Sequence, residues 1–205
     1  MRTLEGWSRR LKPAVVRGGR ALPRLWLVSD PVRLPDPSAA AARLPRGAGV
    51  LARGLDGAVL AALALMCRRR GLLLLVAGDG RTALRLGAGL HVPDRVPARG
   101  LLPFLRARCG GVRWALLSVA VHGRAGAARG RRLRADLGLV SPAFQTASHP
   151  GAPALGPLRW AGLAARSGRP AVALGGVAAG NAARLPKAGR GRAAALAAIG
   201  ALAGR

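Results

Sequence analysis

The run ADLGLVSPAFQTASHPGAPALGPLRWAGLAARSGRPAVALGG, residues 135–176, decides the fold. Its first apolar segment, 136–141, is typical of a buried strand, and a loop of small, polar and turn residues follows over 142–156. A helix is expected around 158–166 and a second short strand over 171–174. Strand, loop, helix and strand in this order predict one unit of a parallel α/β fold.

The second strand runs directly into a glycine pair, Gly175 and Gly176. Glycine adopts positive φ and lets backbone N–H groups approach an anion without a Cβ in the way. A helix expected to begin near Asn181 would add the positive end of its dipole. In a (β/α)₈ barrel such phosphate sites lie in the loops after the last strands. The pair therefore predicts half of a phosphate site, although a plain turn between strand and helix also favours glycine.

Apolar segments of strand length recur on both sides of this run and alternate with segments rich in Ala and Leu. The expected strands are 25–29, 49–53, 72–77, 90–92, 114–121, 136–141, 171–174 and 193–197. The expected helices are 56–70 with Asp56 as its N-cap, 81–86, 124–134, 158–166 and a terminal helix. Eight strands alternating with helices in so short a chain predict a compact (β/α)₈ TIM barrel, with a doubly wound sheet as the alternative.

The chain divides into two parts on this reading. Residues 1–24 carry scattered Arg, Gly and Pro, and we expect an N-terminal extension that holds at most a short helix and need not be well ordered. Residues 25–205 are expected to form the barrel as a single domain.

The composition is strongly basic. The chain has 205 residues, 51% of them apolar, and a formal charge of +27, with Lys12 and Lys187 as its only lysines. The arginines are spread along the whole chain and accompany Ala, Gly, Leu and Pro, which all have GC-rich codons. No Tyr, two Phe and four Trp leave no aromatic platform between the charges. We expect no specific nucleic-acid binding, only attraction to polyanions at low salt.

Cys67 and Cys109 are expected to be buried free thiols, because no second pair could complete a metal site. No apolar signal region follows the arginines near the N-terminus, and the apolar runs 58–67 and 72–77 are too short to span a bilayer. These features predict a soluble cytoplasmic protein without a membrane partner.

The residues 135–156, followed by VALGGV at 172–177 and Asn181, resemble the thiamine phosphate synthase family, which includes thiazole tautomerases. LVSD at 27–30, GAGLH at 87–91 and AVH at 120–122 stand in the order and spacing of that family. The resemblance covers residues 25 to about 202. It implies a (β/α)₈ barrel that binds a thiazole phosphate and, through Mg²⁺, a pyrimidine pyrophosphate. The family's synthases join these two small molecules to give thiamine phosphate.

Several positions match the site of this family. Arg53 ends the second strand, where the family's arginine would clamp pyrophosphate. Thr146 and Ser148 take the hydroxyl positions of the loop after the sixth strand, and Gly175 and Gly176 match the turn that binds the thiazole phosphate.

Other positions depart from the family. Its Asn-Asp-Asp after the third strand is Ala77-Gly78-Asp79 here, its second metal carboxylate falls on Val96, and Ala120 replaces a serine. The lysine expected after Ser148 is His149, which could bind phosphate or a ring nitrogen or lie in solvent.

The remaining carboxylates could still form a magnesium site. Asp79 and Asp94, with Asp30, follow expected strands, and Mg²⁺ accepts one or two carboxylates when water and phosphate supply the other ligands. The alternative for Asp79 is a turn residue between two glycines.

Histidines offer a second chemistry. His122 follows the fifth expected strand and could serve as a general base or donor, or could merely cap that strand, whereas His91 is expected in the core. The tautomerases of the family lack the metal carboxylates, but their base lies where this chain has Pro142. The resemblance therefore leaves three alternatives: a divergent synthase, a metal-independent tautomerase that uses His122 or His149, and a non-catalytic binder of thiazole phosphate or thiamine phosphate.

Overall fold

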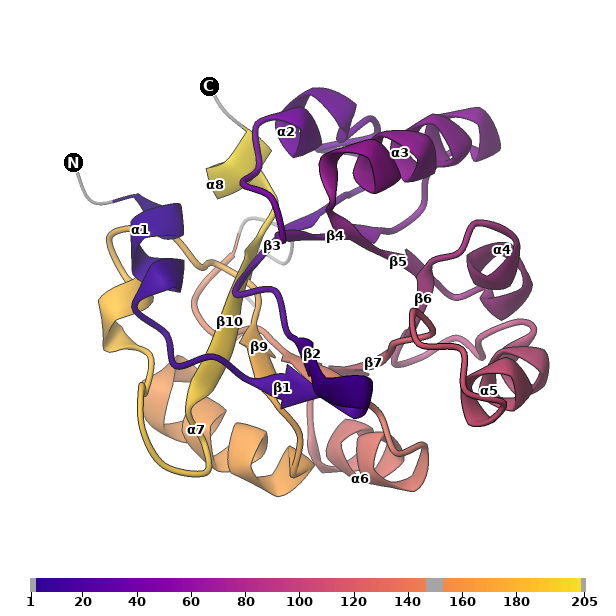
Figure 1. Ribbon diagram of the computed structural model, residues 1–205. Helices are drawn as coiled ribbons and strands as arrows, with labels where there is room; N and C mark the ends of the chain where they lie inside the picture. Colours follow the sequence, from indigo (N-terminus) through magenta and orange to yellow (C-terminus); the bar gives the residue numbers. More distant parts are fainter. Residues whose placement is uncertain (1–2, 147–152, 204–205) are drawn as a thin grey trace.

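The protein forms a closed barrel of eight parallel strands, which Figure 1 shows nearly along its axis. The computed structural model describes residues 3–146 and 153–203. The strands follow one another around the barrel in the order β10, β3, β4, β5, β6, β7, β8 and β9. They comprise β3 (Leu25–Val28), β4 (Gly49–Ala52), β5 (Leu73–Ala77), β6 (Gly89–Val92), β7 (Leu117–Val121), β8 (Leu137–Val140), β9 (Ala171–Ala173) and β10 (Ala193–Ala198).

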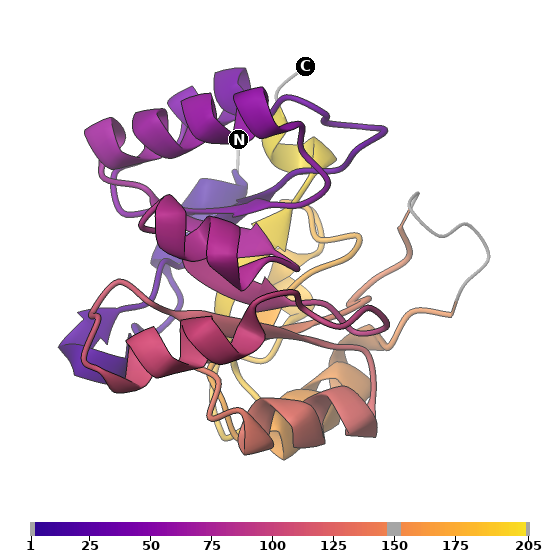
Figure 2. The ribbon, with the colours of Figure 1, turned by 90° about the vertical axis from the view of Figure 1, so that its right-hand side faces the viewer.

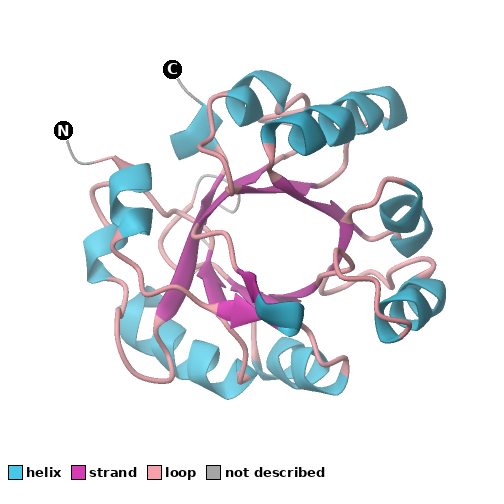
Figure 3. Ribbon diagram, in the orientation of Figure 1, coloured by secondary structure: helices cyan, strands magenta, loops and turns pink. Residues whose placement is uncertain are grey.

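Helices surround the strands (Figure 3). They are α2 (Ser38–Ala42), α3 (Gly57–Arg70), α4 (Gly80–Arg85), α5 (Leu101–Cys109), α6 (Arg124–Arg132), α7 (Gly156–Ser167), α8 (Gly200–Ala203) and the 3₁₀ helix η2 (Ala182–Arg184). Alternating strands and helices around a closed sheet confirm the expected (β/α)₈ barrel.

Three local expectations need correction. The strand expected over 114–121 begins only at Leu117, because the backbone turns beforehand, with Leu116 N donating to Trp114 O. The helix expected near Asn181 is the single 3₁₀ turn η2, and the chain between β9 and β10 contains no longer helix. Cys67 is buried as expected, but Cys109, at the end of α5, is exposed.

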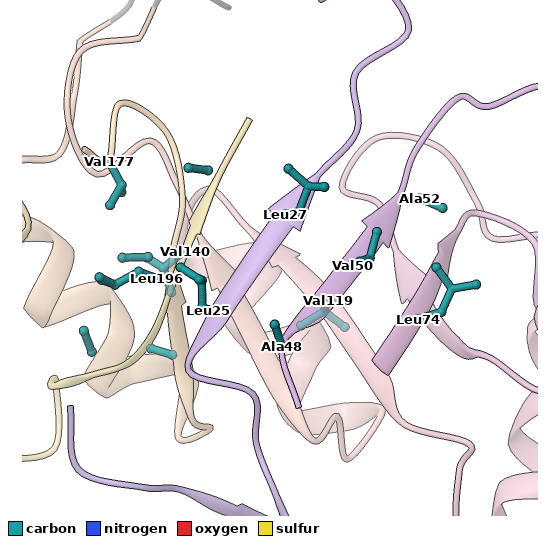
Figure 4. Packing of buried hydrophobic residues seen from close by; sticks show 14 of the residues in the cluster. Leu25, Leu27, Ala48, Val50, Ala52, Leu74, Val119, Val140, Val177 and Leu196 are labelled. Atoms are coloured by element: carbon teal, nitrogen blue, oxygen red, sulfur yellow. The ribbon is translucent and has the colours of Figure 1, made fainter. Parts of the chain in front are cut away.

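Side chains of each strand alternate between two cores. Trp26, Leu51 and Leu75 belong to the core inside the barrel, whereas their neighbours in sequence pack outward against the helices. Figure 4 shows part of that outer core, including Leu27 and Val50. Position 49, which faces the interior of the barrel, requires glycine because a Cβ there would lie 2.3 Å from the Trp26 ring.

The N-terminal segment packs against the barrel. In α1 (Leu4–Arg9), Leu4 and Trp7 are buried in the outer core. A hairpin of β1 (Val15–Val16), η1 (Arg17–Gly19) and β2 (Arg20–Ala21) follows, and the buried Val16 belongs to the inner core. Figure 2 shows the hairpin on one side of the barrel, whereas the segments that follow β8 extend on the other. The hairpin therefore covers the amino end of the barrel.

Within the two described ranges, no helix combines the length and the apolarity that a membrane crossing requires. The cytoplasmic location and the division at residue 24 remain predictions from the sequence.

Candidate functional site

The carboxyl ends of the parallel strands meet at one end of the barrel, where polar side chains follow several strands. Asp30 follows β3, Arg53 follows β4, Asp79 follows β5 and His122 follows β7. This end is where enzymes with this fold bind and convert their substrates. We call Asp30, Asp79 and Asp94 the carboxylate side, and residues 175–178 after β9 the glycine turn.

Arg53 is fixed at this end of the barrel by residues from the neighbouring strand. Its backbone N–H donates to Ser29 Oγ at 2.6 Å, and its guanidinium Nη2 donates to Asp30 Oδ2 at 2.8 Å. Its side chain is 44% exposed, and no other hydrogen bond of the guanidinium is found in the described chain. The remaining N–H groups of Arg53 are therefore available to an anionic ligand.

Asp30 is saturated by hydrogen bonds from the protein. Besides Arg53, the Arg33 guanidinium donates to Oδ2 at 3.1 Å, and the backbone N–H groups of Val32 and Arg33 donate to Oδ1. The bond from Arg33 holds the pKa of this carboxyl far below its usual range, against the opposing effect of burial. Asp30 is thus an ionised partner of two arginines.

Asp79 serves as the N-cap of α4. Its Oδ1 accepts from the backbone N–H groups of Arg81 and Thr82, and its Oδ2 accepts from Thr82 Oγ1 at 2.8 Å. Burial opposes ionisation, but the bonds from Thr82 and Arg81 outweigh it and lower the pKa of Asp79. Asp79 therefore makes the contacts of a turn residue, which was the alternative to a metal ligand.

Asp94 lies in the loop after β6 and pairs with a residue of α6. Arg129 Nη2 lies 2.7 Å from Asp94 Oδ1, and Arg129 Nη1 donates to the Asp94 backbone carbonyl, also at 2.7 Å. The sequence analysis did not single out Arg129. Its only signal is its place in a helix that follows a barrel strand, and many arginines of this chain share that feature.

The described side chains form no preformed magnesium site. Across residues 3–146 and 153–203, no three His, Cys, Asp or Glu side chains gather closely enough to hold a metal ion. The carboxylates of Asp30, Asp79 and Asp94 accept from arginines or from a helix terminus instead. The three carboxylates of the carboxylate side therefore already accept hydrogen bonds from the protein itself.

His122 is held by Ser141, the residue that follows β8. Its Nδ1 lies 3.1 Å from the Ser141 carbonyl oxygen and 3.2 Å from Ser141 Oγ. Because a carbonyl oxygen only accepts, Nδ1 carries the proton, and Nε2 keeps a lone pair in the neutral ring. The residue is exposed, so a ligand at this end of the barrel can reach that lone pair.

His91 belongs to the core, as expected. It is buried on β6, and its Nδ1 lies 2.8 Å from Ser118 Oγ of β7. Burial lowers the pKa of His91 to about 3, and cationic groups at this end, Arg53 foremost, act in the same direction. His91 is therefore a neutral structural residue.

The glycine turn packs against the loop after β8. Gly175 and Gly176 have φ of 87° and 64°, and a Cβ on Gly176 would lie 2.0 Å from the Gln145 carbonyl oxygen. Phe144 N donates to Gly175 O at 2.9 Å, and Asn181 Nδ2 donates to Gly176 O at 2.7 Å. Close backbone packing thus requires both glycines, and Asn181 braces the turn in place of the expected helix.

The backbone N–H groups of Gly176 and Val177 donate to no acceptor in the described residues. Two successive free N–H groups beside a residue with positive φ are typical of backbone anion sites. Thr146, in the neighbouring loop, is half-buried, whereas Ser148 and His149 lie outside the described residues.

Comparisons with known proteins agree with this architecture. A family model described as thiamine monophosphate synthase matches residues 57–199. Thiamine phosphate pyrophosphorylase from Pyrococcus furiosus has a similar structure, with a TM-score of 0.68 and 19% identity over 89% of this chain and 88% of that chain. At this identity the structural likeness shows the fold alone. No curated protein sequence matches the chain.

Proposed function

Because the chain belongs to the thiamine monophosphate synthase family, we propose that it binds a thiazole phosphate at the carboxyl end of its barrel and joins it to a pyrimidine pyrophosphate. The product would be thiamine phosphate. The observation that carries the proposal is the glycine turn, whose free N–H groups at Gly176 and Val177 suit the phosphate of the thiazole. The packing of Gln145 behind the turn preorganises these groups.

Arginines supply positive charge for the second substrate. Arg53 and Arg33 both pair with the carboxylate of Asp30, so one positive charge remains in excess. Arg53 also keeps free N–H groups. In the joining step the thiazole nitrogen bonds to the pyrimidine methylene carbon, while the bond from that carbon to the pyrophosphate oxygen breaks. The pyrophosphate leaves with the bonding electrons, and a guanidinium that donates two parallel hydrogen bonds stabilises the charge it gains.

An assay of thiamine phosphate formation tests this function. With both substrates, we expect product in the presence of EDTA, because the carboxylates accept from arginines and from a helix terminus. Arg53→Gln should lower kcat/KM roughly 100-fold or more, since charge-assisted contacts to the leaving group are lost. Arg69→Gln, at an exposed arginine of α3, is the matched control and should leave the rate unchanged.

Failure of the assay has a defined meaning. Absence of product at high enzyme concentration, both with EDTA and with added Mg²⁺, would refute the synthase activity. Calorimetry with the thiazole phosphate alone then measures whether the glycine turn still binds its ligand. Saturable binding without turnover would identify the protein as a non-catalytic binder.

A thiazole phosphate tautomerase is the second candidate, and the geometry of His122 favours it. The contact with Ser141 orients the imidazole so that Nε2 can accept a proton, as a general base must. Exchange of substrate hydrogen for solvent deuterium in EDTA would detect such activity. His122→Ala should abolish the exchange while the affinity for the thiazole phosphate remains within about threefold, because the phosphate contacts come from the backbone.

A further inference from the structure

The amino end of the barrel contains a cavity of about 560 Å³, which lies opposite the site described above. Its walls come from the segments that precede β8 and β9, the end of α5 and the N-terminal hairpin. A volume of this size falls in the range of small-molecule sites. The proposed reaction uses none of these residues.

Three arginines line the cavity: Arg108, Arg134 and Arg169. One of them is neutralised, because Arg108 Nη2 lies 2.9 Å from Asp136 Oδ1 in a buried ion pair. The other oxygen of Asp136 accepts from Leu117 N at 2.7 Å, so this carboxylate is fully engaged. Within the described chain, no carboxylate forms an ion pair with Arg134 or Arg169, and the cavity keeps an excess of two positive charges.

Arg169 contributes a guanidinium that donates no hydrogen bond within the described residues. Its Nε is buried and has no hydrogen-bond partner in the described residues. The Nη atoms of the same guanidinium form no hydrogen bond in the described residues and are not among the fully buried unpaired atoms. An anion in the cavity can therefore accept from these terminal N–H groups.

Arg134 is held in a conformation that favours glycine. Its φ is 48°, and it is the only residue other than glycine with positive φ in the described residues. Its backbone carbonyl accepts from Arg108 Nη2 at 2.9 Å, a bond that glycine would form equally well. Glycine codons are as GC-rich as those of arginine, so composition alone does not explain an arginine here.

Apolar side chains also line the cavity. Val15 and Val16 of the hairpin and Pro170 before β9 contribute hydrocarbon surface. A lining that combines arginines with hydrocarbon surface suits a molecule with one charged and one apolar part. We propose that the amino end of the barrel binds a small organic phosphate, of the size of a nucleotide, through Arg134 and Arg169.

Cys109 provides a reporter at this site, because it lines the cavity and is exposed. The other thiol, Cys67, is buried, and burial raises its pKa to about 11, so it reacts slowly. The rate of alkylation by N-ethylmaleimide, an uncharged reagent, therefore measures access to the cavity. Cys109→Ser should abolish the fast phase of alkylation.

The experiment measures this rate with ADP or pyrophosphate at about 150 mM salt, where long-range attraction to the +27 chain is screened. Each probe should slow the alkylation of Cys109 saturably, by about tenfold or more. Arg169→Gln should raise the half-protecting concentration about tenfold or more, as expected for the loss of a charge-assisted bond. Arg134→Gly should also weaken protection but melt no lower than the wild type, because glycine tolerates positive φ.

Two controls separate this site from general attraction and from the carboxyl end. Arg69→Gln removes an exposed charge of α3, and Arg53→Gln removes the arginine at the other end of the barrel. Neither should change the half-protecting concentration. Absence of protection, or an equal loss in Arg69→Gln and Arg169→Gln, would overturn the proposal.

Discussion

The glycine turn and the carboxylate side lie at the same end of the barrel but are held in different ways. Backbone packing holds the turn, since a Cβ on Gly175 would approach Pro142 Cα to 2.8 Å and one on Gly176 would overlap Gln145. Side chains hold the carboxylate side, where Asp30 and Asp94 accept from arginines. A site made of backbone persists as long as the fold does, whereas side chains can be replaced or take new partners without loss of the fold.

Substitution of Gly176 tests the turn most strongly. Gly176→Ala should destabilise the protein by about 3 kcal/mol or more and abolish thiazole phosphate binding, because positive φ and the overlap with Gln145 both oppose a Cβ. Gly47→Ala is matched in φ, at 81°, but its Cβ would meet nothing within 4 Å, so it should cost only about 1 kcal/mol. Urea unfolding measures both values. Equal costs would show that packing does not hold the turn.

Acid should weaken the fold through His91, which is buried in β6, the strand that precedes the loop of Asp94. The pKa of His91 is about 3 in the folded protein but near 6.5 in the unfolded chain, so the unfolded chain binds more protons between these values. The contribution of His91 to the free energy of unfolding is therefore fully present above about pH 6.5. It falls on acidification, by roughly 2 kcal/mol between pH 7 and pH 5.

His91→Asn is the control for this pH dependence, because asparagine can keep a hydrogen bond to Ser118 without titrating. Urea midpoints of the variant should change less than those of the wild type over the same pH range. Parallel curves would mean that His91 takes up a proton in the folded state.

The barrel itself could be read from the sequence because the apolar strands, the glycines and the N-cap at Asp56 are local signals. Helix α2 was missed because it has only five residues, and α5 was missed because Pro103 and two arginines interrupt its apolar pattern. At the site, position along the chain located Arg53 and the glycine turn correctly at the carboxyl end. It could not show that Asp79 caps α4 or that Arg129 pairs with Asp94, because such partners depend on side-chain direction and on contacts distant in sequence.

Removal of the Asp30 carboxylate should have opposite effects on stability and on anion binding. Asp30→Asn should cost about 1 to 2 kcal/mol at pH 7, since the bonds from Arg33 and Arg53 lose their charge. The lowered pKa of Asp30 means that this contribution is present above its unfolded value and is lost as the pH falls below it. With both arginines released, the affinity for pyrophosphate should rise about threefold to tenfold. A fall in affinity, measured by calorimetry, would place Asp30 among the ligand contacts.

The smallest effect is expected at Asp79, and it decides whether the carboxylate side retains any metal chemistry. Asp79→Ala should cost about 1 kcal/mol, like Asp56→Ala at the N-cap of α3, because both carboxylates accept backbone N–H groups at a helix start. If capping is the whole role of Asp79, millimolar Mg²⁺ should change the affinity for pyrimidine pyrophosphate by less than about twofold in the wild type and in both variants. An increase of tenfold with Mg²⁺ that Asp79→Ala removes and Asp56→Ala retains would show that the ligand itself assembles a metal site. The metal site on the carboxylate side would then form only when the substrate binds. The glycine turn, in contrast, is already formed before its ligand arrives.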